Sequence, residues 1–211
     1  MNYLVTGTDT GVGKTFVTCG LVQAARALGK RCIGMKPFCT GDPGDVGRIS
    51  AANGHVLPRH RVNPIWFRAP LAPYAAALVE NRILDIHGAK ESYLALAKEF
   101  ESVLVEGAGG LLVPILERYD FRELAAEWEL EIILVVANRL GAINHALLTV
   151  EAIKTHGLPL RAVILNEINE SESLAQQTNP SILAHLLSAP PIYLAHGQMD
   201  FGEITQALGW G

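Results

Sequence analysis

The sequence lacks the patterns that would support disulfide, zinc or covalent nucleophile chemistry. Its three cysteines are an odd number and form no C-x-x-C pair, so we expect a reducing compartment and no disulfide framework. Its seven histidines show no H-x-H or H-E-x-x-H spacing, which argues against a zinc site. No G-x-S-x-G nucleophile elbow is present. The chemistry of this chain is therefore to be sought in its other motifs.

The sequence also lacks a basic excess and long apolar runs. The formal net charge is −4, so we expect no broad basic face and no nucleic-acid partner. No apolar run approaches the roughly 20 residues that span a bilayer, and residues 201–211 contain no Lys or Arg. The N-terminus enters a strand-like run without the basic and apolar regions of a signal peptide. These features predict a cytoplasmic protein that does not bind membranes.

Short apolar runs recur along the chain instead. With 211 residues, 49% of them hydrophobic, the composition predicts one globular domain spanning residues 1–211. The runs are continuous rather than alternating, which is typical of strands buried on both faces of a parallel sheet. The six runs are residues 3–6, 32–35, 102–105, 132–136, 162–165 and 192–194.

Stretches with helical periodicity lie between these runs. In residues 89–100 and 143–153, apolar side chains follow the i, i+3/i+4, i+7 rhythm of one buried stripe. The alternation predicts an α/β fold, a doubly wound and mostly parallel sheet with helices on both faces. Ligands should then bind at the carboxyl ends of the strands. Residues 54–74 are irregular and contain four prolines, so we expect a long surface loop there.

The strongest motif is a phosphate-binding loop at residues 7–15. It reads Gly-Thr-Asp-Thr-Gly-Val-Gly-Lys-Thr and lies between a strand-like run and a helix-like run. Glycines let backbone N–H groups face an anion, and the following helix N-terminus adds partial positive charge. We expect Lys14 to reach the β- and γ-phosphates and the Thr15 hydroxyl to ligate Mg²⁺. Thr8 stands where the strict pattern has Gly, so this is a variant P-loop.

Two charged residues end other predicted strands. Glu106 follows the run 102–105 and precedes glycines, so it occupies the Walker-B place near a metal bound at the phosphate loop. Lys36 directly follows the run 32–35, where an ammonium suits an anionic substrate or a transferring phosphoryl group. A solvent-exposed strand end is the alternative interpretation of each residue.

Two segments near predicted helix starts are open to two interpretations each. Asp42 and Asp45 flank a Pro-Gly pair, and either carboxylate could cap a helix over residues 45–52 or bind a metal. The turn at residues 140–145 also opens a helix. Its N–H groups could bind a carboxylate, but an ordinary strand-to-helix turn fits the same residues.

Together and in this order, these motifs resemble the dethiobiotin synthetase family. The shared pieces are residues 7–15, Lys36-Pro37, residues 105–110 and residues 140–145, and the resemblance covers residues 3 to about 166. It implies a P-loop NTPase-like fold and an ATP- and Mg²⁺-dependent ligase of biotin biosynthesis. The family carboxylates 7,8-diaminononanoate with CO₂ and closes the cyclic urea of dethiobiotin, giving ADP and phosphate.

The resemblance implies roles for individual residues. The residues it implies for ATP are Thr10, Gly11, Val12, Gly13, Lys14, Thr15, Phe16, Glu106 and Asn166, of which Asn166 reads the adenine edge. The residues it implies for the substrate are Thr10, Lys36, Thr40 and Gly109 and, across the interface of a homodimer, Gly141, Ala142, Ile143 and Asn144. Thr10, Lys14 and Lys36 are the expected catalytic residues.

The resemblance leaves open which of two aspartates binds the metal. It implies Thr15, Glu106 and an aspartate as Mg²⁺ ligands. The family spacing of that aspartate to two apolar residues is met by Asp42, with Asp45 as the alternative. Residues 195–197 also depart from the family's Gly-x-Ile-Pro ending, and Gly11 replaces a common Glu. The nucleotide preference is therefore less constrained than the reaction type.

Two other functions share part of this pattern. A ParA/MinD-like ATPase switch has the same fold, but it carries a lysine near the start of its loop, where residues 8–11 are Thr-Asp-Thr-Gly. An ATP-dependent amidoligase usually needs a glutaminase domain, for which 211 residues leave no room. Stabilisation of the protein by diaminononanoate would distinguish the first interpretation from both.

Overall fold

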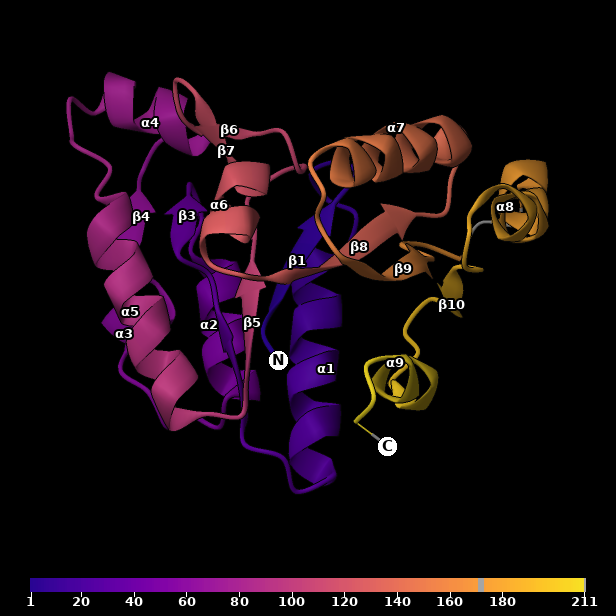
Figure 1. Cartoon of the computed structure of the whole chain (residues 1–211), viewed down its shortest axis with the longest axis horizontal. Coiled ribbons are helices and arrows are strands. Elements are labelled where there is room, and N and C mark those ends of the chain that lie inside the picture. The colour runs from indigo at the N-terminus through magenta and orange to yellow at the C-terminus, as the bar shows by residue number, and fades with distance from the viewer. Residues whose placement is uncertain (171–172, 211) are drawn as a thin grey trace.

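The computed structural model describes residues 1–170 and 173–210, in which six strands form one parallel sheet (Figure 1). The strand order is β10-β9-β8-β1-β5-β2, and all five neighbouring pairs are parallel. The strands are β1 (Tyr3–Gly7), β2 (Cys32–Met35), β5 (Ser102–Glu106), β8 (Glu131–Ala137), β9 (Leu160–Asn166) and β10 (Ile192–Leu194). The six predicted strand runs and the predicted doubly wound fold are therefore confirmed.

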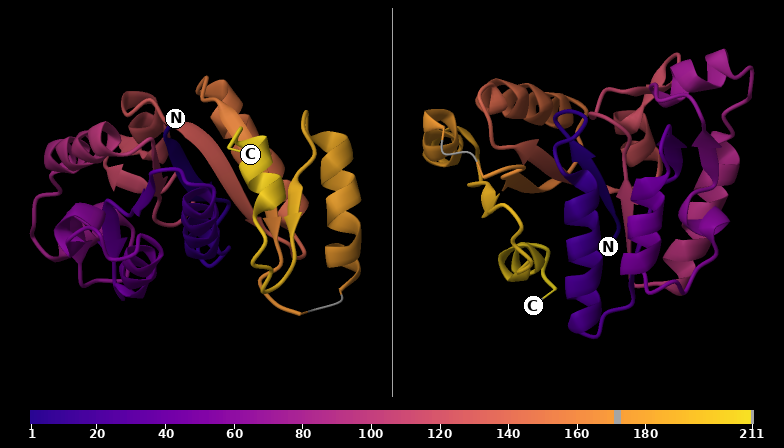
Figure 2. Two further views of the ribbon diagram at one scale, coloured as in Figure 1. Left: turned by 90° about the horizontal axis from the view of Figure 1, so that it is seen from below. Right: turned by 180° about the vertical axis from the view of Figure 1, so that it is seen from behind.

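Helices cover both faces of this sheet (Figures 1 and 2). Helices α1, α2 and α9 pack on one face, and α5, α6 and α7 pack on the other. Helix α8 lies against α7 near the β10 edge. The helices are α1 (Lys14–Ala27), α2 (Gly44–Ala52), α3 (Arg59–Val62), α4 (Pro73–Val79), α5 (Ile86–Glu99), α6 (Phe121–Glu127), α7 (Ala142–Thr155), α8 (Leu174–Leu186) and α9 (Gly202–Ala207).

The continuous apolar runs are explained by burial on both faces. In β5, Val103 and Val105 belong to the core beneath α5, while Leu104 between them belongs to the core beneath α1. Successive side chains of a strand point to opposite faces, so a strand that is covered twice needs an apolar residue at every position. The N-terminal strand, with Leu4 on one face and Val5 on the other, follows the same rule.

The segment 54–74 differs from the expected surface loop. It contains α3 and β4 (Ile65–Phe67), and β4 pairs in parallel with β3 (Phe38–Thr40). The side chains of Val62 and Phe67 are fully buried. The prolines interrupt regular structure without preventing burial, because short elements between them still present apolar side chains to the core.

A second small sheet and the strand ends frame the site. Strands β6 (Pro114–Leu116) and β7 (Tyr119–Asp120) form an antiparallel pair after the glycine-rich segment that follows β5. Since the six main strands are parallel, their carboxyl ends all lie at one edge of the sheet. Among the described residues, no helix is long and apolar enough to cross a bilayer.

Candidate active site

The phosphate-binding loop connects β1 to α1 at the carboxyl edge of the sheet. Gly13 adopts a φ of 94°, a left-handed conformation that favours glycine. A Cβ on Gly7 would lie 2.6 Å from the Val12 side chain, so the tight turn also requires glycine there. The Nζ atom of Lys14 donates a hydrogen bond to the Asp9 carbonyl oxygen at 2.9 Å. The loop is thus folded as a compact cradle with the lysine held across it.

Asn166 joins the end of β9 to this loop. Its Nδ2 atom donates to the Val12 carbonyl oxygen at 2.9 Å, and the side chain is buried. A Cβ on Gly13 would lie 2.2 Å from the same Nδ2 atom. The structure therefore places the residue predicted to read adenine directly behind the phosphate loop, although the two segments are far apart in sequence.

Two of the residues predicted to contact the nucleotide, Val12 and Phe16, have side chains that are buried or packed against other residues. Val12 is 1% exposed and belongs to the core. Phe16 packs against Phe201, with ring centroids 5.8 Å apart. Gly11, with a φ of 75° and nothing within 4 Å of its Cβ position, lies open to solvent. Contacts of Val12 to a phosphate would therefore come from its backbone N–H group.

A charged cluster lies beside the loop, at the ends of β2 and β5. The Lys36 ammonium contacts Glu106 Oε1 at 2.5 Å and Asp45 Oδ2 at 3.1 Å. The Thr15 hydroxyl donates to the same Glu106 Oε1 at 2.9 Å. Lys36 and Glu106 are both buried, so the interpretation of these residues as solvent-exposed strand ends is wrong. Buried charges of this kind must be paired, and here they pair with one another.

The cluster shifts the pKa values of its members. Burial alone would lower the pKa of Lys36, but the Glu106 and Asp45 carboxylates outweigh it and hold that pKa above its ordinary value. Burial alone would raise the pKa of Asp45, and Lys36 holds it below the ordinary value. Burial, reinforced by nearby Lys36, lowers the pKa of Lys14 to about 8 despite the opposing effect of Glu106. The site thus holds two lysines whose pKa values are shifted in opposite directions: that of Lys36 is raised and that of Lys14 is lowered.

The oxygen atoms of this cluster fit Mg²⁺. Glu106 Oε2 is buried and accepts no hydrogen bond from any residue that the structure describes. The Thr15 hydroxyl and the Asp45 carboxylate supply further oxygen atoms on the same side. Hard oxygen ligands of this type are those that Mg²⁺ prefers, and Mg²⁺ usually takes only one or two carboxylates together with substrate phosphates. The described residues contain no cluster of three or more acidic, His or Cys side chains that could hold a metal ion.

The two candidate aspartates lie in different surroundings. Asp42 is exposed, and its Oδ1 atom accepts a hydrogen bond from the Gly44 N–H group at 3.0 Å, at the start of α2. Asp45 lies one residue into α2 and faces Lys36. The geometry therefore favours a capping contact for Asp42 and a place in the charged cluster for Asp45. Sequence spacing placed Asp42 first, but spacing does not show where α2 begins. The helix begins at Gly44 with Pro43 as its N-cap residue, so Asp42 lies before the helix and Asp45 within it.

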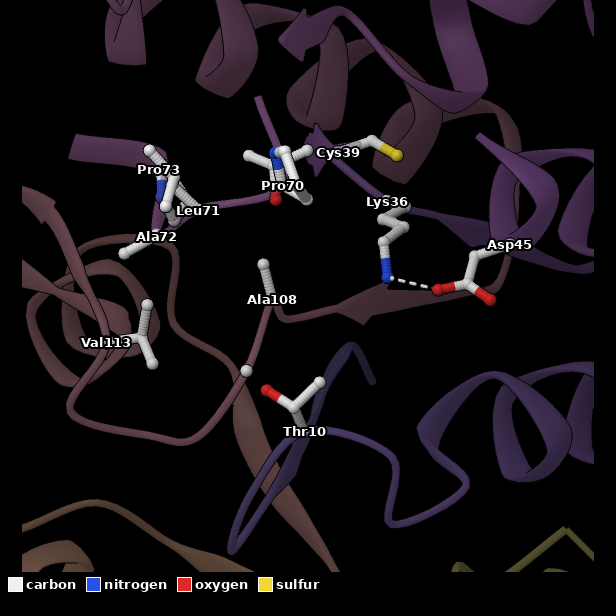
Figure 3. Close-up of a pocket in the computed structure, with 12 residues that line it drawn as sticks. Thr10, Lys36, Cys39, Asp45, Pro70, Leu71, Ala72, Pro73, Ala108 and Val113 are labelled. Carbon is white, nitrogen blue, oxygen red and sulfur yellow. Dashed lines mark hydrogen bonds and ion pairs between the residues drawn. The ribbon is translucent and has the colours of Figure 1, made fainter. Parts of the chain in front are cut away.

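A cavity of about 550 Å³ opens beside the charged cluster. Figure 3 shows Lys36 and Thr10 pointing toward it, with Ala108 to one side of them. The predicted substrate residues Thr10, Lys36, Thr40 and Gly109 all line it. Its remaining lining residues are Cys39, Asp45, Pro70, Leu71, Ala72, Pro73, Ala108 and Val113. One end is therefore charged and the rest is largely apolar, which suits a molecule with reactive polar groups and an aliphatic chain.

The turn that opens α7 lies outside this cavity. Leu140 is 88% exposed, Asn144 is exposed, and neither is among the cavity residues. Gly141 is the N-cap of α7 with a φ of 90°, while Ala142 is buried and Ile143 packs against the core. The structure thus separates these four predicted substrate residues from the predicted ones that line the cavity of the same chain.

The sequence analysis missed several residues near the site. Leu71 and Val113 line the cavity, but single apolar residues in irregular segments give no periodic signal. Asp9 and Arg139 form an ion pair at 2.9 Å beside the phosphate loop. Asp9 lies inside the recognised motif, and Arg139 lies two residues beyond the end of β8. Their contact depends on β1 and β8 being neighbours in the sheet, which the sequence does not show.

Comparisons of structure support the fold. The chain is similar to the septum site-determining protein MinD of Pyrococcus horikoshii, solved with Mg-ADP, at a TM-score of 0.56 and 17% identity over 100% of this chain and 89% of MinD. It is also similar to the signal recognition particle receptor FtsY of Elizabethkingia anophelis, at a TM-score of 0.56 and 15% identity. That match covers 94% of this chain, which spans 60% of the FtsY chain. At such identities the likeness concerns the P-loop fold alone.

Comparisons of sequence are more specific. A family model described as an AAA domain matches residues 1–192. The chain is 42% identical to the ATP-dependent dethiobiotin synthetase BioD of Anaeromyxobacter dehalogenans strain 2CP-C, over 97% of this chain and 94% of the relative. It is 40% identical to BioD of Akkermansia muciniphila, over 98% and 99%, and 38% identical to BioD of Aquifex aeolicus, over 90% and 87%. The motifs, the fold and these relatives agree, and the chain belongs to the ATP-dependent dethiobiotin synthetase family.

Proposed function

We propose that this chain, as a single P-loop α/β domain spanning residues 1–211, carboxylates 7,8-diaminononanoate with CO₂ and closes it to dethiobiotin at the expense of ATP. The observation that carries the proposal is the position of the Lys36–Glu106–Asp45 cluster between the phosphate loop and the half-apolar cavity. A phosphoryl donor on one side and an aliphatic diamine on the other would meet at this cluster. The family membership gives the reaction its substrates.

The residues of the cluster have distinct tasks in this reaction. Thr15, Glu106 and Asp45 would hold Mg²⁺, which when bound would neutralise charge on the β- and γ-phosphates. Lys14 leaves the Asp9 carbonyl and holds the phosphates. Lys36, kept charged by its two carboxylates, stabilises the carbamate oxygens that form when an amine of the substrate takes up CO₂.

Ring closure needs orientation rather than an enzyme nucleophile. Transfer of the γ-phosphoryl group to a carbamate oxygen makes that oxygen a good leaving group, and the second amine then attacks the carbonyl carbon. Thr10 and Thr40 line the cavity and would orient the carbamate. Holding the two amines beside each other lowers the entropic part of the barrier. The apolar wall formed by Pro70 and Val113 would pack against the methylene chain.

We also propose that the working form is a cytoplasmic homodimer. Leu112 and Leu148 are 55% and 63% exposed and line one hollow beside Thr10, so an apolar surface borders the active site. Contiguous exposed apolar surface of this kind marks interaction sites. A two-fold dimer through this surface would bring the partner's turn at residues 140–144 toward the open end of the cavity. The N–H groups at that helix start and Asn144 would then bind the substrate's tail carboxylate.

A phosphate-release assay tests the reaction. Purified protein is incubated with MgATP, and phosphate is measured with diaminononanoate and bicarbonate together and with each omitted. The proposal predicts sustained release only when both are present, with dethiobiotin formed in equal amount. Nonanoate, which has the chain and the carboxylate but no amines, serves as the control and should give no release. Equal phosphate release without the diamine would contradict the proposed function.

A further inference from the structure

An ion pair joins the phosphate loop to the end of β8. Arg139 Nη2 lies 2.9 Å from Asp9 Oδ2, across 130 positions of sequence. Both side chains are about half exposed, at 47% and 49%. An exposed pair of this type contributes little to folding stability. Its position beside the catalytic loop calls for another explanation.

Asp9 accepts three hydrogen bonds from different parts of the chain. Its Oδ2 atom accepts from Arg139, its Oδ1 atom accepts from the Thr10 N–H group at 2.7 Å, and its carbonyl oxygen accepts from Lys14 Nζ at 2.9 Å. The neighbouring Thr8 N–H group donates to the Val135 carbonyl of β8 at 3.1 Å. The loop segment before Lys14 is therefore attached in two ways. The Thr8 backbone is hydrogen-bonded to β8, and the Asp9 side chain is paired with Arg139, just beyond the end of β8.

Arg139 is itself held in place. Its carbonyl oxygen accepts a hydrogen bond from Asn179 Nδ2 at 3.0 Å, and the same amide donates to Asn138 Oδ1 at 2.9 Å. Asn138 and Asn179 are buried. Arg139 also directly precedes the turn at residues 140–144. A fixed backbone and a paired guanidinium together couple the phosphate loop to the start of α7.

We propose that Arg139 is a positioning residue for the ring-closing reaction. Acting through the Asp9 carboxylate, it fixes the conformation of residues 8–10 and so directs the Thr10 side chain into the substrate cavity. It touches neither substrate nor nucleotide. The proposal rests on the proposed function, because Thr10 is the group whose orientation it sets.

The test uses kinetics, nucleotide affinity and amide exchange on four variants. They are Arg139→Gln, Arg139→Lys, Asp9→Asn and the double variant that combines Arg139→Gln with Asp9→Asn. Arg31→Gln is the matched control, since Arg31 also forms an exposed ion pair, with Glu101, at the opposite end of the strands. Measured quantities are kcat and KM for diaminononanoate, the Kd for MgADP and hydrogen exchange of the Thr10 amide.

Arg139→Gln is expected to lower kcat/KM for diaminononanoate roughly fivefold, in line with the loss of one exposed charged contact. The MgADP affinity should stay within about twofold of wild type, because Lys14 and the rest of the loop remain. Exchange of the Thr10 amide should become faster. Arg139→Lys should restore most of the activity, and the double variant should be no worse than Asp9→Asn, since both changes break one interaction.

Three results would overturn the inference. These are wild-type kinetics and wild-type Thr10 exchange in Arg139→Gln, additive losses in the double variant, or a loss confined to MgADP affinity. The wild-type protein in the same assay separates this inference from the proposed function. A wild type without diamine-dependent phosphate release contradicts the function, whereas an active wild type with an unaffected Arg139→Gln variant contradicts only the role of Arg139.

Discussion

Two regions of the molecule carry predicted substrate contacts, and they differ in almost every physical respect. At the carboxyl ends of β2 and β5, Lys36 and Glu106 are buried, charged and paired, and Lys36 lines a formed cavity. At the start of α7, Leu140 and Asn144 are exposed and lie outside that cavity. The first region is assembled by one chain. The second presents its groups outward.

The difference indicates a division of labour within the site. The phosphoryl-transfer part needs charges fixed in a desolvated place, and a doubly wound sheet provides that where its strands end. The anchor for a distant carboxylate needs only a helix start with free N–H groups. Such an anchor can be supplied by a second copy of the chain.

The largest expected effect belongs to the charged region. Lys14→Ala should reduce turnover at least about 10²-fold, because the ammonium that holds the transferring phosphoryl group is lost. Diamine-dependent phosphate release measures the effect. Circular dichroism should show an intact fold, since Lys14 contributes charge rather than apolar packing. Lys98→Ala, which removes an exposed lysine of α5, is the control and should retain wild-type turnover.

The two candidate metal ligands allow a sharper test of the same region. Asp45→Asn should raise the Mg²⁺ concentration for half-maximal activity by roughly 10- to 100-fold, because it removes a carboxylate that faces the cluster. Asp42→Asn should leave that concentration nearly unchanged, since the exposed Asp42 carboxylate accepts the Gly44 N–H group and does not contact the charged cluster in the part of the chain that the structure describes. A Mg²⁺ titration of each variant decides between them. An increased requirement in Asp42→Asn alone would contradict the assignment of Asp45.

The smallest of the three effects is expected at the turn. Asn144→Ala should raise KM for diaminononanoate roughly tenfold, the order of one lost hydrogen bond to a charged group, and leave MgADP binding unchanged. A methyl ester of the substrate lacks the tail charge, so it should bind wild type weakly and be little affected by the mutation. If the ester binds wild type as well as the acid does, the tail carboxylate has no anchor at this turn.

Much of the fold could be predicted because burial leaves a direct record in sequence. Strand β2 has the predicted bounds, since all four of its residues are buried and the apolar run therefore marks the whole strand. The segment 54–74 could not be predicted in this way. Strand β4 has only three residues, and Trp66 between its two buried neighbours is partly exposed, so periodicity had too few positions to register.

The candidate site was predictable where a motif fixes the backbone. The phosphate loop and Lys36 directly follow strands and Glu106 is the last residue of β5, so their side chains converge at the carboxyl edge of the sheet. The choice between Asp42 and Asp45 was not predictable, because it depends on where α2 begins relative to a Pro-Gly pair. The contact of Asp9 with Arg139 was hidden for a different reason. It depends on β1 and β8 being neighbours, which spacing along the chain does not reveal.

The most direct test of the division between the two regions is complementation between two defective variants, one in each region. Lys14→Ala protein is mixed with Asn144→Ala protein, subunits are allowed to exchange, and turnover is measured at a diaminononanoate concentration far below KM of the Asn144→Ala variant. If the turn of one subunit serves the cavity of the other, each mixed dimer contains one intact site. The mixture should then recover up to roughly a quarter of wild-type activity. Activity equal to the average of the two separate variants would contradict the account.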